Sequence, residues 1–197
     1  MECETESNAL VIIGANGSGK SKLGAWIENQ SLEDVHRIGA QRSLIFNENI
    51  ALKSYSQAED LVFWGTSKNS RDGNKGHRWN WGKYTTTLMN DFENVLAALI
   101  DLKNNENDVF PQRKLLLEDS KFYACLPSDE NAIKYSATEM SDGERSVLYL
   151  AAQVLCVPKD KTLIIDEPEI HLHRSIMSRL WKSLEKHRPD CFYIYYT

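Results

Sequence analysis

Residues 14–21, GANGSGKS, have the types and spacing that bind a polyphosphate. They fit the pattern G-x-x-x-x-G-K-[ST] at every fixed position, between an apolar run and a helical one. Glycine permits backbone angles that a Cβ forbids, so the amides of such a loop can converge on phosphate oxygens. Lys20 would reach the β- and γ-phosphates, and Ser21 would place its hydroxyl on Mg²⁺. The residues predicted to bind nucleotide here are Gly14, Asn16, Gly17, Ser18, Gly19, Lys20 and Ser21.

Two carboxylates, Asp166 and Glu167, follow a second apolar run, TLII at 162–165. Acids that leave a hydrophobic strand are unfavourable unless a cation or hydrogen bonds compensate them. Asp166 is placed to hold Mg²⁺, directly or through water, and Glu167 to polarise the attacking water. Alone, the pair would be better explained as an exposed acidic turn. Together with the phosphate-binding loop, it predicts Lys20 and Glu167 as catalytic residues.

A third feature, MSDGER at 140–145, opens an amphipathic helix. Ser141 or Asp142 can cap that helix, and Gly143 lets another surface approach closely. A hydroxyl and free amides at a helix N-terminus form an anion site. Taken alone, a capped helix start without a ligand is the better explanation of these residues.

The three features sit on alternating strands and helices. Apolar runs predict strands at 9–13, 44–46, 162–165 and 191–197, and the first is expected to be buried on both faces. Helices are predicted at 20–29, 85–102, 141–157 and 172–187, with the threonines at 85–87 as N-caps of the second. This alternation predicts an α/β fold with a mostly parallel central sheet flanked by helices.

The composition of the 197 residues, 42% hydrophobic and 26% charged, is that of an ordinary globular chain. The 23 basic and 28 acidic residues give a net charge of −5, which excludes a generic binder of polyanions. No apolar run approaches the roughly 18 residues of a membrane span, and the acidic amino terminus is no signal peptide. We therefore expect a cytoplasmic protein that does not bind a membrane.

One stretch, 71–84, interleaves cations with aromatic side chains in the sequence RDGNKGHRWNWGKY. Cations and stacking rings grip single-stranded nucleic acid. The alternative, a loop that its tryptophans anchor to its own core, is the stronger interpretation. For His171 and His173, a helix start is likewise a stronger interpretation than a metal site.

Together and in this order, the three motifs resemble the ATPase domain of the ABC superfamily, with MSDGER in place of the LSGGQ-type signature. Asp142 and Glu144 depart from the transporter form. The segment DEPEIHLHRSI at 166–176 resembles OLD-like nucleases and related ATPases of bacterial anti-phage defence. GANGSGKSKLGAWIE and RPDCFYIYYT resemble ATPases joined to, or partnered with, a TOPRIM-like (DUF4435) domain, as in the PARIS system.

The resemblance implies a P-loop NTPase head over 1–197, with its core sheet in 9–55 and 136–197 and an inserted helical or lid subdomain at about 56–135. It implies an ATPase that uses ATP and Mg²⁺ and closes as a head-to-tail dimer. Ser141 and Gly143 of one copy would then meet the γ-phosphate held by the other. Such a dimer is a nucleotide-driven switch that controls an effector, here a TOPRIM-like one.

The family also has a glutamine that senses the γ-phosphate and Mg²⁺, and Gln41 is the candidate. Arg42 could contact phosphate instead, and a plain loop-to-strand junction explains the pair equally well. Only 13 residues precede Gly14, and the chain stops at Thr197, one position before the family's switch histidine. We therefore expect a C-terminally truncated fragment that hydrolyses ATP slowly. A non-hydrolysing nucleotide-binding scaffold and a Rad50/RecF-like DNA-repair ATPase remain alternatives, although no heptad run supports the second.

Overall fold

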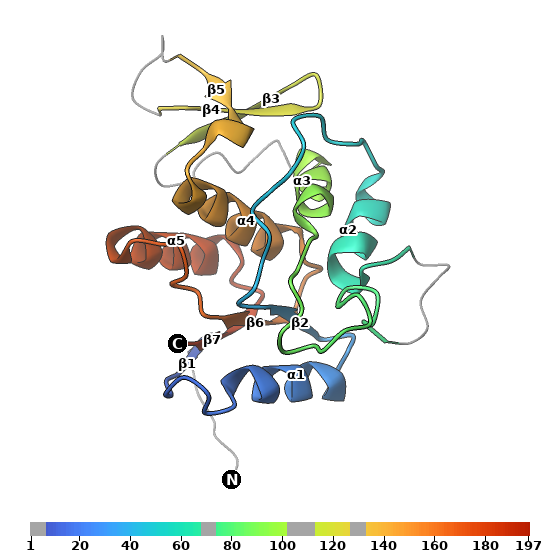
Figure 1. Ribbon diagram of the computed structural model, residues 1–197, viewed down its shortest axis with the longest axis vertical. Helices are drawn as coiled ribbons and strands as arrows, with labels where there is room; N and C mark the ends of the chain where they lie inside the picture. Colours follow the sequence, from blue (N-terminus) through green and yellow to red (C-terminus); the bar gives the residue numbers. More distant parts are fainter. Residues whose placement is uncertain (1–6, 68–73, 102–112, 127–132) are drawn as a thin grey trace.

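The centre of the molecule is a parallel sheet of four strands in the order β1-β7-β6-β2 (Figure 1). The computed structural model describes residues 7–67, 74–101, 113–126 and 133–197. The strands are β1 (Ala9–Ile12), β2 (Val35–Ile38), β6 (Thr162–Asp166) and β7 (Phe192–Tyr196). Helices cover the two faces of this sheet, so the fold is α/β with a parallel central sheet, as predicted.

The two faces of the sheet support cores of different size. Helix α1 (Lys20–Gln30) covers one face, on which Ile164 and Tyr196 belong to a small apolar cluster. The other face supports the main core, which receives Leu163 and Ile165 because successive strand residues point to opposite sides. The helices over this second face are α2 (Tyr55–Trp64), α3 (Phe92–Asp101), α4 (Asp142–Cys156) and α5 (Arg174–His187).

A small antiparallel sheet lies at the opposite end of the molecule from α1 (Figure 1). Its strands are β3 (Lys114–Glu118), β4 (Lys121–Cys125) and β5 (Tyr135–Ser136), in that order. A 3-10 turn, Ala137–Glu139, leads from β5 into α4. Helices α2 and α3 share the main core with α4. The division into a core and an insertion at about 56–135 stays a prediction.

The prediction that residues 9–13 are buried on both faces is wrong. β1 is an edge strand that pairs only with β7 among the described residues, and Leu10 and Val11 are 44% and 55% exposed. A parallel strand is covered on both sides only where helices extend over it, and α1 packs mainly against β2 and β6, away from β1.

Two predicted boundaries also differ. Residues 44–46 form no strand, although Leu44 and Phe46 are buried, because this segment crosses the helices of the main core and packs Phe46 against Phe92. The second helix begins at Phe92 and not at the threonines. Met89 cannot be helical, since its backbone pairs with Gln41 and Ser43.

Candidate functional site

The phosphate-binding loop connects the end of β1 to the first residue of α1, Lys20. Gly17 and Gly19 have φ values of 82° and 95°, in the left-handed region that favours glycine. A Cβ on Gly14 would lie 2.8 Å from the Ser18 hydroxyl oxygen. The glycines therefore stand where the compact turn requires them.

The loop closes around the Lys20 side chain. The Lys20 ammonium donates hydrogen bonds to the carbonyls of Gly14 and Ala15, at 2.5 Å and 3.3 Å. The Ser18 amide donates to the Ala15 carbonyl at 3.0 Å. These bonds fix the cation beside the amides that precede α1.

The end of β7 aligns the loop with the acidic pair. The Gly14 amide donates to the Thr197 carbonyl, and the Glu167 amide donates to the Tyr196 carbonyl at 2.8 Å. Glu167 has a φ of 48°, so the chain turns sharply as it leaves β6. Two consecutive carbonyls thus bring together loops that are far apart in the sequence.

A cavity of about 260 Å³ lies between the phosphate-binding loop and Glu167. The structure brings Lys20, Ser21 and Glu167 together there, as the sequence predicts. Thr85 and Thr86, which the sequence pattern predicts to be helix caps, also line this cavity. The full lining is Asn16, Gly17, Ser18, Gly19, Lys20, Ser21, Lys22, Thr85, Thr86 and Glu167. No sequence signal beyond the run of three threonines could have assigned Thr85 and Thr86 to it.

Asp166 is buried at the end of β6 but does not line this cavity. Its Oδ1 atom has no hydrogen-bond partner among the described residues. A buried carboxylate oxygen without a partner is unfavourable, and a cation would compensate it. Mg²⁺ is commonly held by one or two carboxylates together with substrate phosphates, so Asp166 and the Ser21 hydroxyl fit that ion.

Gln41 is exposed and does not line the cavity, and its backbone carbonyl accepts a hydrogen bond from the Met89 amide. Its assignment to the γ-phosphate and Mg²⁺ stays a prediction. Arg42 is buried and donates to the carbonyls of Asp166 and Glu167, at 3.4 Å and 3.2 Å. Burial lowers the pKa of Arg42, and the nearby acids oppose that shift. Arg42 therefore braces the acidic pair through its backbone.

Ser141 caps α4, since its hydroxyl accepts from the Glu144 amide and the Glu144 carboxylate accepts from the Ser141 amide at 2.9 Å. Gly143 lies close to the His171 carbonyl, which a Cβ would approach to 3.2 Å. Burial alone would raise the pKa of Glu144, but hydrogen bonds from Ser141 and the charge of Arg113 lower it overall. Neither Ser141 nor Gly143 lines the cavity of its own chain.

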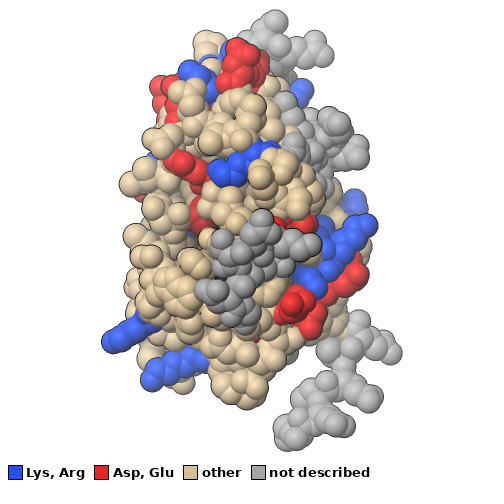
Figure 2. Space-filling view, turned by 90° about the vertical axis from the view of Figure 1, so that its right-hand side faces the viewer, with Lys and Arg blue, Asp and Glu red and all other residues tan. Residues whose placement is uncertain are grey.

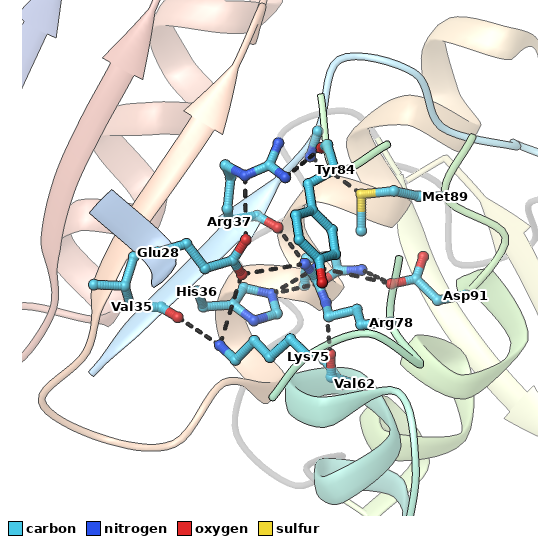
Figure 3. Close-up of polar contacts among 12 residues, drawn as sticks. Glu28, Val35, His36, Arg37, Val62, Lys75, Arg78, Tyr84, Met89 and Asp91 are labelled. Carbon is cyan, nitrogen blue, oxygen red and sulfur yellow. Dashed lines mark hydrogen bonds and ion pairs between the residues drawn. The ribbon is translucent and has the colours of Figure 1, made fainter. Parts of the chain in front are cut away.

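Two cations of the loop at 74–84, Lys75 and Arg78, point inward (Figure 3). Lys75 lies 3.7 Å and Arg78 3.9 Å from the Glu28 carboxylate, and both are buried. Trp79 is buried as well, whereas Trp81 is 58% exposed. Lys75 and Arg78 are therefore unavailable to nucleic acid, whereas Lys83 is exposed. The alternative, a loop anchored in its own core, holds for Lys75, Arg78 and Trp79, and nucleic-acid binding by this stretch stays a prediction.

Arg37 joins this loop to the sheet and to α1 (Figure 3). Its Nε atom lies 3.2 Å from the Glu28 carboxylate, and its Nη2 atom donates to the Tyr84 carbonyl at 2.5 Å. Its guanidinium lies 3.8 Å from the centre of the Trp79 ring. We call Glu28, Arg37, Lys75, Arg78 and Asp91 the buried charge cluster.

The surface around α2 carries charges of both signs (Figure 2). On this face the described Lys and Arg side chains are scattered, some of them beside Asp and Glu, and form no broad basic area. None of the helices in the described ranges is long and apolar enough to span a membrane. His173 caps α5 through its ring, as the helix-start interpretation predicts.

Comparison with known proteins gives a structural match and a family match for this chain. One solved structure with a similar fold is a "Putative ABC transporter (ATP-binding protein)" from Pyrococcus furiosus, at 15% identity and a TM-score of 0.49, covering 96% of this chain and 78% of that one. A search of curated proteins gave no match. A family profile described as "AAA domain, putative AbiEii toxin, Type IV TA system" matches residues 67–191 and thus includes Asp166 and Glu167. Because that match spans more than half of the sequence, the chain belongs to this family of AAA domains.

Proposed function

We propose that this chain binds ATP with Mg²⁺ in the cavity between the phosphate-binding loop and Glu167, and hydrolyses it. The observation that carries the proposal is that Lys20, Ser21 and Glu167, from opposite ends of the sequence, line one cavity. Its lining is polar and cationic next to Lys20 and Lys22, which suits a phosphate chain. Membership in a family of AAA domains supports the same function.

In this mechanism the residues act by position and charge. Amides of the phosphate-binding loop and the Lys20 ammonium bind the β- and γ-phosphates. The Glu167 carboxylate orients a water molecule toward the γ-phosphate. Ser21, Asp166 and, in the family's pattern, Gln41 would hold Mg²⁺, which neutralises phosphate charge when bound.

We further propose that ATP joins two copies head to tail. Ser141 and Gly143 of the second copy would meet the γ-phosphate, and their absence from the cavity of their own chain supports this arrangement. Hydrolysis would remove the bridge and make the dimer a switch. Its output in anti-phage defence, through a TOPRIM-like effector in the cytoplasm, rests on the resemblance alone.

Replacement of Lys20 tests the binding site. Lys20→Ala should abolish measurable ATP binding in isothermal titration calorimetry, because the β- and γ-phosphates lose the cation that the phosphate-binding loop supplies. Lys186→Ala, which removes an exposed lysine of α5, is the control and should bind as the wild type does. Unchanged binding by Lys20→Ala would refute the site.

Replacement of Glu167 tests the chemistry. Glu167→Gln should keep ATP binding and lose phosphate release by roughly 10²-fold or more, because a water-orienting base contributes on that order. The measurement is a phosphate-release assay with Mg²⁺ and ATP in excess. Turnover at the wild-type rate would exclude Glu167 as that group, and binding without turnover in the wild type would favour the non-hydrolysing scaffold.

A further inference from the structure

We propose that Thr85 and Thr86 bind the terminal phosphate of the nucleotide, in the place where the family's pattern suggested Gln41. The proposal rests on the proposed function, because it assigns new contacts to the same cavity. Thr85 and Thr86 line that cavity together with Lys20, Ser21 and Glu167, whereas Gln41 is exposed outside it.

The two threonines form the tip of a tight turn. The Lys83 carbonyl accepts hydrogen bonds from the amides of Thr86 and Thr87, each at 3.0 Å. It also accepts one from the Thr87 hydroxyl at 2.7 Å. Thr87 thus stabilises the turn from within, and Thr85 and Thr86 remain at its tip, facing the cavity.

Both ends of this turn are fixed to the site. On one side, Arg37 donates to the Tyr84 carbonyl and pairs with Glu28 of α1, the helix that begins at Lys20. On the other side, the Met89 amide donates to the Gln41 carbonyl at 2.9 Å, beside Arg42, which braces the carbonyls of Asp166 and Glu167. The turn is therefore positioned by the same elements that hold the phosphate-binding loop and the acidic pair.

The lining also indicates which part of the nucleotide the threonines meet. Among the described residues, no aromatic or large apolar side chain lines the cavity for a base to stack on, and apart from Lys22 its other polar groups are those assigned to phosphate, Mg²⁺ and water. Glu167, the candidate for orienting water at the γ-phosphate, lines it too. Hydroxyls at this end can donate to phosphate oxygens, and hydrogen bonds to charged groups are stronger than those between neutral groups.

The test compares a non-hydrolysable ATP analogue with ADP by calorimetry in Mg²⁺. Thr85→Val and Thr86→Val keep the side-chain shape and remove the hydroxyl. Together they should weaken binding of the analogue about tenfold, the loss expected for a hydrogen bond to a charged group, and that of ADP much less. Thr85→Ser and Thr86→Ser keep the hydroxyls, perturb the fold least and should keep the wild-type ratio of the two affinities.

Thr162→Val is the matched control, because Thr162 lies at the opposite end of β6 from Asp166 and does not line the cavity. An unchanged affinity ratio in the double valine variant would overturn the proposal, as would an equal loss in Thr162→Val or a lost ratio in the serine variants. Failure of the binding site itself would look different. Lys20→Ala would then bind both nucleotides as the wild type does, or the wild type would bind neither, and the threonine proposal would fall with it.

Discussion

At the scale of single residues, burying the charged side chains of the buried charge cluster costs free energy. Arg37, Lys75 and Arg78 are three buried cations with two carboxylates between them, since all three lie near Glu28 and Arg78 also lies near Asp91. Removing charges from water costs several kcal/mol per ion unless partners compensate them. Desolvation lowers the pKa of Lys75 to about 7, while Glu28 opposes the shift and Arg78 adds to it. The cluster is thus easier to bury when Lys75 is neutral.

This cluster predicts a dependence of stability on pH. In the unfolded chain Lys75 keeps its proton up to about pH 10, and in the folded chain it releases it near pH 7. Between these values the unfolded state binds more protons, so the free energy of unfolding should rise with pH by up to about 1.4 kcal/mol per unit. Lys75→Met keeps the aliphatic stem and should lack this rise.

Urea denaturation at pH 7, 8 and 9 measures this effect. Lys186→Met, at an exposed position of α5, serves as control and should follow the wild type. The comparison between variants is needed because several buried tyrosines have a pKa raised above its ordinary value. Their ionisation in the unfolded chain therefore begins to lower the free energy of unfolding toward the upper end of the range. Parallel curves for Lys75→Met and the wild type would contradict a neutral buried lysine.

At the scale of elements, the close approach of α1 to the sheet positions the phosphate-binding loop. Gly24 makes this possible, since a Cβ there would lie 2.8 Å from the Tyr196 ring and 3.1 Å from the Arg37 side chain. Alanine is the better helix former by about 1 kcal/mol, so an isolated α1 would gain from the change. In the folded chain we expect Gly24→Ala to lose roughly 1–3 kcal/mol through overpacking.

Thermal unfolding followed by circular dichroism gives the sign of the effect. Asn29→Ala, at an exposed position of the same helix, improves helix propensity without a contact to the sheet and should leave the transition unchanged or higher. A higher melting temperature for Gly24→Ala would show that the contact between helix and sheet is loose.

The sequence predicts the elements with strong local signals. Helix α1 follows a glycine loop, α4 follows a capping serine, and α5 ends just before a proline. Strands β6 and β7 are continuous apolar runs. β2 escaped prediction because its sequence, VHRI, carries two polar residues that only long-range partners satisfy. The same holds for 74–84, where Glu28, distant in sequence, pairs with Lys75 and Arg78 and so permits their burial.

The candidate site likewise combines residues with a local sequence signal and residues positioned by contacts distant in the sequence. The phosphate-binding loop and Glu167 belong to contiguous motifs, so local sequence alone predicts a role for them, and both line one cavity in the structure. Thr85 and Thr86 reach that cavity only because Arg37 and Met89 fix the turn from both sides. A signal that arises from tertiary contacts cannot be predicted from local pattern, and an N-cap was the local explanation of three threonines.

At the scale of the whole molecule, one chain holds only part of the proposed machinery. Ser141 and Gly143 lie at the start of α4 and do not reach the cavity that contains Lys20. Asp142 and Glu144 add negative charge at the same helix end, and Arg145 and Arg113 pair with them. A partner's phosphate could approach this end because these pairs offset the carboxylates.

The dimer can be tested with two serines that cap their helices in the same way. Ser141 caps α4 and Ser54 caps α2, each in a capping box, so replacing either by alanine should cost about 1 kcal/mol. In a Glu167→Gln background with Mg²⁺ and ATP, we expect analytical ultracentrifugation to show a dimer. Ser54→Ala should keep that dimer, and Ser141→Ala should lose it while still binding ATP, because only Ser141 would face the partner's γ-phosphate. If the two variants dimerise equally, Ser141 acts only as a helix cap. That result would contradict the proposed contact between Ser141 and the partner's γ-phosphate in the head-to-tail dimer.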